Sequence, residues 1–156
     1  MLPVWILMVG KTRMGFVEEG LELYRRRLQP YLEVTLKSVR QEKEAKHLPP
    51  EVIKAREGER LRQALPARAF VTALDARGKM FTSEEFARWL GRREEEGRPL
   101  VFLVGGHLGL DEATLALARE TLALSRLTLT HELARLVLLE QLYRAATILS
   151  GHPYHV

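Results

Sequence analysis

The alternation of apolar and polar positions predicts four strands before residue 105. Short apolar runs at residues 3–9, 69–74 and 100–104 have the length and composition of strands that are buried on both faces of a parallel sheet. Residues 32–39 alternate apolar and polar side chains, which predicts a strand with one wetter face. Residues 75–79, directly after the strand at 69–74, are expected to form a turn.

Between these strands, apolar residues recur at helical spacing. The pattern predicts helices over residues 16–29 and 51–65, and Thr82 with Glu85 forms the capping-box signature that opens a third helix. Strands that alternate with helices indicate an α/β fold, in which a mostly parallel sheet carries helices on both faces. No repeat, low-complexity segment or linker divides the chain, so residues 1–156 are expected to form one domain.

A glycine-rich turn follows the apolar run at residues 100–104. It has the sequence GGHLG at residues 105–109, and Asp111 behind it has the position of a helix N-cap, with Glu112 in the first turn. Backbone approaches a ligand closely where glycine leaves no side chain in the way, and ligands of open α/β sheets lie beyond the carboxyl ends of the strands. We therefore expect a small-molecule site at residues 105–109; a tight turn without a ligand is the alternative.

The C-terminal third predicts a short helix, a last strand and one long helix. Residues 111–122 are expected to be helical, and residues 123–130 to form a strand with a loop. Thr130 has the position of an N-cap for a helix from His131 to about Leu149, which is apolar nearly all round. A helix of this kind needs two apolar partners. The sheet is one of them, and we predict that the same helix of a second subunit is the other, in a two-fold homodimer.

Composition narrows the class of protein. The chain contains no cysteine, which excludes disulfides, a thiolate nucleophile and a thiolate metal site. Residues 1–9 lack the basic leader of a signal peptide, and no apolar run has the length of a membrane span, so we infer a cytoplasmic location without a membrane partner. The net charge of +4 and the isoelectric point of about 9.6 are compatible with an anionic partner such as RNA.

Two nucleotide-binding motifs are incomplete. Gly10 to Thr12 resemble the end of a phosphate-binding P-loop, but Trp5 occupies the position of its first glycine, which favours a plain strand-to-helix turn. The order GGxxG differs from the dinucleotide fingerprint, and Ser125 and Arg126 stand where an acidic residue would hold a ribose, which argues against an NAD enzyme. The backbone of residues 125–130 could instead face an adenine edge, or form an ordinary edge strand.

Four polar residues interrupt the long apolar helix. Glu140 and Arg144 stand four positions apart and are expected to form an ordinary ion pair. Together with Arg135 and Gln141 they are also candidates for a site at the seam between two subunits.

The tail HPYH is richer in functional groups than most chain termini. Tyr154 and His155 could accept or donate a proton, or stack on a base, and a disordered tail is the alternative. The histidines have no third ligand at suitable spacing, so no metal is expected.

Three segments together resemble one known family. They are FLVGGHLGL from residue 102, LALSRLTLTHELARLVLLEQLYRAATIL from residue 122, and the terminal HPYH, with VGKTR and TALDARGK earlier in the chain. The chain resembles the ribosomal large-subunit methyltransferase H family of the SPOUT class over essentially its whole length. The resemblance implies a deep trefoil knot at the C-terminal end of the sheet, a homodimer, and S-adenosylmethionine bound in the knot. The implied reaction is methylation at N3 of a pseudouridine in 23S rRNA of the assembled ribosome.

The resemblance also implies roles for individual residues. Arg144, Tyr154 and His155 match positions near the substrate, and the candidate proton acceptors are His155, then Tyr154, then solvent through Glu140. Two positions depart from the family, because many relatives carry proline where His107 and Thr130 stand. The implied methyl-donor site consists of Leu74, Gly106, Ser125, Arg126, Leu127, Thr128, Leu129 and Thr130.

Two alternatives remain at this point. One is a ribosome-binding or RNA-binding protein that keeps the fold without catalysis. The other is a nucleotide-binding enzyme of the flavodoxin-like type.

Overall fold

The computed structural model describes residues 1–156 and contains a single five-stranded sheet. The strand order is β2-β1-β4-β3-β5, and every pairing is parallel. Ile6 of β1 lies opposite Leu36 of β2 on one side and Phe102 of β4 on the other. This confirms the predicted α/β class with a parallel sheet. The strands are β1 (Pro3–Val9), β2 (Glu33–Val39), β3 (Phe70–Lys79), β4 (Leu100–Val104) and β5 (Glu120–Leu122).

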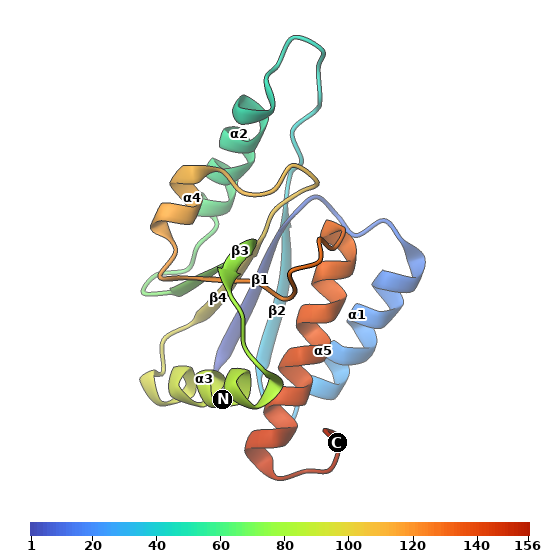
Figure 1. The fold of residues 1–156 in the computed structure, drawn as a ribbon, viewed down its shortest axis with the longest axis vertical. Coiled ribbons are helices and arrows are strands. Elements are labelled where there is room, and N and C mark those ends of the chain that lie inside the picture. Colours follow the sequence, from blue (N-terminus) through green and yellow to red (C-terminus); the bar gives the residue numbers. More distant parts are fainter.

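Helices cover both faces of the sheet, as predicted (Figure 1). The larger core packs three helices on one face, and the smaller core packs the other two on the opposite face. All five residues of β4 are buried, which explains why this strand is a continuous apolar run. The first group comprises α1 (Gly15–Leu28), α3 (Ser83–Glu96) and α5 (His131–Ser150), and the second comprises α2 (Pro50–Gln63) and α4 (Glu112–Leu117).

The three predicted helix N-caps are present. Thr82 Oγ1 accepts from the backbone N–H of Glu85 at 3.1 Å, and the Glu85 carboxylate accepts from the backbone N–H of Thr82 at 2.8 Å. Asp111 caps α4, and Thr130 Oγ1 accepts from the backbone N–H of Leu133 at 3.2 Å to cap α5. Each cap satisfies donors that a helix start leaves without an intrahelical partner.

The turn expected at residues 75–79 is wrong, because β3 continues to Lys79. Lys79 and Leu74 both pair with Leu122, so β3 carries a bulge between them. Gly78 permits the close approach of β5, since a Cβ added there would lie 2.7 Å from the backbone of Thr121. The dipeptide Arg77-Gly78 therefore serves a bulged strand, although it has the composition of a turn.

The segment after the glycine turn also differs from the prediction. The helix expected over residues 111–122 ends at Leu117, and its last residues form β5 instead. The backbone N–H of Arg119 donates to Val71 O at 2.8 Å, which directs the chain into the sheet. Residues 123–130 contain no strand. Pairing with β3 thus overrides the helical propensity of this alanine- and leucine-rich segment.

The long helix α5 lies between α1 and α3 and packs on the sheet (Figure 1). Leu138, Leu139 and Leu142 are fully buried among residues of the same chain. These neighbours supply the apolar partner that the sequence analysis assigned to a second subunit, so the pattern of α5 does not by itself require a dimer. No helix of the chain combines the length and apolar character that crossing a membrane requires.

Candidate functional site

A cavity of about 720 Å³ opens at the carboxyl ends of β4 and β5, beside residues 74–76 in the middle of β3. The segments that follow β4 and β5 and the first turn of α5 complete its walls. This is the edge at which open α/β sheets bind ligands, and the volume suits a small molecule.

The glycine turn forms one wall of the cavity. Gly106 and Gly109 make an isolated antiparallel bridge, and the N–H of Gly109 donates to Gly106 O at 3.0 Å. Gly109 has φ of +85°, and a Cβ added to Gly105 would lie 2.7 Å from the carbonyl carbon of Gly109. The turn is therefore as tight as predicted, and its closure depends on the absence of side chains at these positions.

Nearly all residues assigned to the methyl-donor site line this one cavity. Ser125 Oγ accepts from the backbone N–H of Leu127 at 2.9 Å, which shapes the loop before α5. Arg126 is exposed and does not line the cavity. Sequence reasoning missed Asp75, because the expected turn concealed that it lies at the cavity edge on β3. The assigned residues that line the cavity are Leu74, Gly106, Ser125, Leu127, Thr128, Leu129 and Thr130.

Two charged residues of α5 fix the loop after β1 beneath the cavity. Arg135 is fully buried and donates to Val9 O at 2.7 Å and to Gly10 O at 2.9 Å. The carboxylate of Glu132 accepts from the backbone N–H of Met14 at 2.9 Å. Arg135 was a candidate for the dimer seam, but the structure places it inside the chain as a structural group.

We predict that Arg135→Met destabilises the fold by about 2–3 kcal/mol, because the buried carbonyls of Val9 and Gly10 lose their donors. Urea unfolding followed by circular dichroism measures this change. Arg92→Met is the matched control, since Arg92 is exposed on α3 and makes no ion pair. Equal unfolding midpoints for the two variants would contradict the structural role of Arg135.

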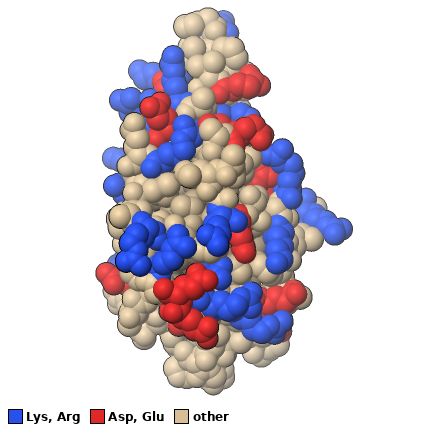
Figure 2. All heavy atoms as spheres, turned by 90° about the vertical axis from the view of Figure 1, so that its left-hand side faces the viewer, with Lys and Arg blue, Asp and Glu red and all other residues tan.

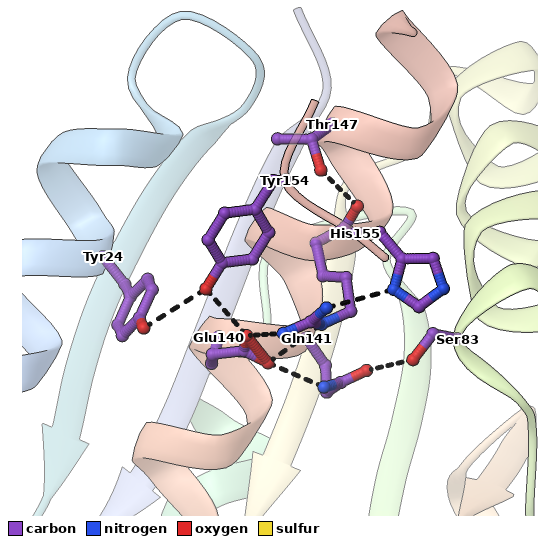
Figure 3. A network of polar contacts seen from close by, with 8 residues as sticks. Tyr24, Ser83, Glu140, Gln141, Thr147, Tyr154 and His155 are labelled. Atoms are coloured by element: carbon purple, nitrogen blue, oxygen red, sulfur yellow. Dashed lines mark hydrogen bonds and ion pairs between the residues drawn. The ribbon is translucent and has the colours of Figure 1, made fainter. Parts of the chain in front are cut away.

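A second group of functional side chains gathers near the chain terminus (Figure 3). Arg144 forms the predicted pair with Glu140, with Nη2 and Oε2 2.8 Å apart. The Tyr154 hydroxyl donates to Glu140 at 3.0 Å, and Nη1 of Arg144 lies 3.0 Å from Nδ1 of His155. The structure thus brings together the three residues that the resemblance placed near the substrate.

The tail makes defined contacts with the rest of the chain. Tyr31 and His152 join through the phenol and Nδ1 at 2.6 Å. Burial raises the pKa of Tyr154, and hydrogen bonds to Tyr24 and Glu140 raise it further. The Tyr154 phenol is therefore protonated at neutral pH and keeps the hydrogen that it donates to Glu140.

The cavity is lined by the first turn of α5, and Glu140 and Arg144 of the tail group lie farther along the same helix. Thr130 and Arg144 are fourteen positions apart, which corresponds to about 21 Å along a helix. Arg144, Tyr154 and His155 are not among the residues that line the cavity of their own chain. No three histidine, aspartate or glutamate side chains gather as metal ligands.

Comparison with known proteins identifies the family. The family model described as "Predicted SPOUT methyltransferase" matches residues 2–155. The chain belongs to the SPOUT methyltransferase family. Ribosomal RNA large subunit methyltransferase H of Geotalea daltonii is 42% identical over 151 residues, which cover 96% of this chain and 97% of the relative. The protein of the same name from Anaeromyxobacter sp. is 45% identical over 150 residues, covering 96% and 97%.

A solved structure shares the fold. The crystal structure of a probable methyltransferase from Bordetella pertussis Tohama I aligns with a TM-score of 0.59 at 16% identity. The alignment covers 93% of this chain and 96% of that one. The resemblance drawn from the sequence is thus confirmed at the level of family, and the SPOUT family excludes the flavodoxin-like alternative.

Proposed function

We propose that this chain methylates ribosomal RNA with S-adenosylmethionine as the methyl donor, at N3 of a pseudouridine in 23S rRNA of the assembled ribosome. The names of its relatives support an rRNA substrate. The net charge of +4 is compatible with such a partner. Figure 2 shows basic side chains spread over one face of the molecule, with acidic side chains interspersed among them.

The charges of the residues that line the cavity support S-adenosylmethionine as the cofactor. No lysine or arginine lines the cavity, although the chain contains 24 of them, whereas the carboxylates of Asp75 and Glu132 do. Burial lowers the pKa of His131, and the charge of Arg135 lowers it further, so this ring at the cavity wall is neutral near pH 7. A sulfonium cation and an ammonium group fit such surroundings better than a phosphate does.

The residues present fit S-adenosylmethionine in shape as well. The close backbone at Gly106 and the loop of residues 125–130 would hold the cofactor through main-chain donors and acceptors. Leu74 and the apolar loop residues supply apolar contact for the adenine. In the SPOUT fold we expect these segments to belong to the C-terminal knot.

We propose a homodimer in which two chains share each site. The separation of about 21 Å between Thr130 and Arg144 along α5 supports this arrangement, because the tail group does not line the cavity of its own chain. One subunit would hold the cofactor, and Arg144, Tyr154 and His155 of the partner would meet the RNA base.

Methyl transfer requires the protein mainly to position the two reactants and to stabilise charge that develops on the base. When bound, S-adenosylmethionine supplies a methyl group on a sulfonium, so N3 must lose its proton to become a nucleophile. The guanidinium of Arg144 would stabilise negative charge that develops on the neighbouring ring carbonyls. Tyr154, which is protonated, donates its hydrogen to Glu140 and so orients that carboxylate, and solvent through Glu140 or His155 would accept the proton.

Methyl transfer to ribosomes tests the proposal. We expect label from methyl-labelled S-adenosylmethionine to enter 23S rRNA of ribosomes that lack the modification, and nucleoside mass spectrometry to locate it on N3 of a pseudouridine. Free 23S rRNA is the control for the assembled ribosome. A chain that binds ribosomes but neither binds S-adenosylmethionine in calorimetry nor transfers label would be the non-catalytic binding protein instead.

A further inference from the structure

His155 is held from both sides of its ring by charged groups of two different helices. On one side, Nη1 of Arg144 on α5 lies 3.0 Å from Nδ1. On the other side, Oε1 of Glu84 in the first turn of α3 lies 2.8 Å from Nε2. Glu84 and His155 are 71 positions apart in the sequence, so α3 brings a carboxylate to the tail from elsewhere in the fold.

These two contacts define the protonation of the ring. A guanidinium can only donate hydrogen bonds, and a carboxylate can only accept them. Nδ1 must therefore be the acceptor for Arg144, and Nε2 must carry the hydrogen that it donates to Glu84. Protonation of Nδ1 would place two donors face to face. The contact geometry thus selects the neutral ring with its hydrogen on Nε2.

The ring in turn fixes the guanidinium. Arg144 has five N–H donors, of which Nε and one on Nη2 bond to Glu140 and one on Nη1 bonds to His155. These bonds fix the guanidinium on two sides. Its Cζ atom lies over the Tyr154 ring, 4.8 Å from the ring centroid. Two N–H groups stay without a protein partner in a guanidinium whose plane is fixed, which leaves donors for ring carbonyls or a phosphate.

We propose that Glu84 is a positioning residue for methyl transfer: it holds His155 in the Nε2–H form, so that Nδ1 aims the guanidinium of Arg144 at the RNA. The proposal rests on the proposed function. It assigns the lone pair of His155 to Arg144, which leaves the proton of N3 to another acceptor. The hydrogen bond to His155 lowers the pKa of Glu84, so the carboxylate is ionised throughout the neutral range.

Three variants of the full chain separate this role from a structural one. Glu84→Ala removes the acceptor, whereas Glu84→Gln keeps an amide oxygen that can accept the same hydrogen bond. Glu95→Ala is the matched control, because Glu95 is an exposed glutamate of the same helix that makes no contact with His155. Glu84 is exposed at the start of its helix, so the fold tolerates both changes.

Two measurements distinguish the variants: the tautomer of His155 and the rate of methyl transfer. Nitrogen-15 spectra of the imidazole report the tautomer: we expect the Nε2–H form in the unaltered chain and in Glu84→Gln, and mixed tautomers in Glu84→Ala. In methyl transfer to ribosomes, Glu84→Ala is expected to lower kcat roughly 10- to 100-fold, as losing the group that orients a functional histidine does. KM for S-adenosylmethionine stays unchanged, and both Glu84→Gln and Glu95→Ala keep kcat near that of the unaltered chain.

The outcomes are distinguishable. An unchanged tautomer or an unchanged kcat in Glu84→Ala would overturn the positioning role. An equal loss of kcat in Glu84→Gln would overturn it too, because the hydrogen bond would then not be the cause. If the unaltered chain fails to methylate ribosomes, the proposed function fails, while the spectra still decide whether Glu84 sets the tautomer of His155.

Discussion

Replacing Gly105 by alanine is expected to lower the affinity for S-adenosylmethionine by at least about 100-fold, because displacing a binding wall by about 1 Å has effects of this size. The added Cβ would lie 2.7 Å from the carbonyl carbon and 2.9 Å from the carbonyl oxygen of Gly109. Both atoms are backbone, so the clash cannot be relieved by rotating a side chain. The turn must open, and it forms one wall of the cavity. Isothermal titration with S-adenosylmethionine measures the loss.

Other glycines of the chain supply the controls. A Cβ on Gly15 would meet nothing within 4 Å, and Gly15 does not line the cavity, so Gly15→Ala is expected to bind almost normally. Gly109 and Gly97 both have positive φ and open space around them, but only Gly109 lies at the cavity. Alanine at either costs about 1 kcal/mol of stability through backbone strain. Of these two variants, Gly109→Ala is expected to weaken binding of S-adenosylmethionine and Gly97→Ala is not. Normal affinity in both Gly105→Ala and Gly109→Ala would exclude the glycine turn as the cofactor wall.

The glycine turn could be predicted because its physical requirements are local. A buried strand, a chain reversal without side chains and an N-cap at Asp111 all lie within a dozen residues. The strands β1, β2 and β4 and the capping box at Thr82 were predictable for the same reason. In each case, the residues that determine the structure are neighbours in the sequence.

The errors occur where distant segments decide the structure. β5 has only three residues, and its strand conformation depends on pairing with β3 rather than on its own composition. The extension of β3 through Gly78 depends on the same pairing. The partners of α5 could not be read from its sequence either, since an apolar helix does not reveal whether its neighbours are α1 and α3 or another subunit.

The candidate site shows the same division. Backbone chemistry indicated the cavity wall at residues 105–109, but the roles of Arg144, Tyr154 and His155 came from the resemblance to a family. The contact of Glu84 with His155 leaves no signal in the sequence, because it joins residues of α3 and the tail that only the fold brings together. Residues that act through other residues are thus the hardest to predict from a single chain.

Mixed dimers of Gly105→Ala and Arg144→Ala chains are expected to recover about half of the unaltered methyl-transfer activity, since one of the two sites of a two-fold dimer is then intact. That site combines the cavity of the Arg144→Ala chain with the tail of the Gly105→Ala chain. Each variant alone is expected to lose activity roughly 100- to 1,000-fold, the usual cost of removing a group that stabilises transition-state charge or of losing the cofactor. Differently tagged chains, co-expressed and purified through both tags, allow the comparison on ribosomes.

The mixed dimer discriminates sharply because the alternative predicts no recovery. If a single chain built its own site, neither chain of the mixed dimer would hold both an intact cavity and an intact Arg144. The positions of these groups along α5 argue against that alternative, since about 21 Å of helix separates Thr130 from Arg144 and Arg144 does not line the cavity of its own chain. Activity no higher than that of the variants alone would therefore reject the shared site. It would also require the tail to move toward its own cavity, against the contacts that tie Tyr154 and His155 to Glu140, Arg144 and α3.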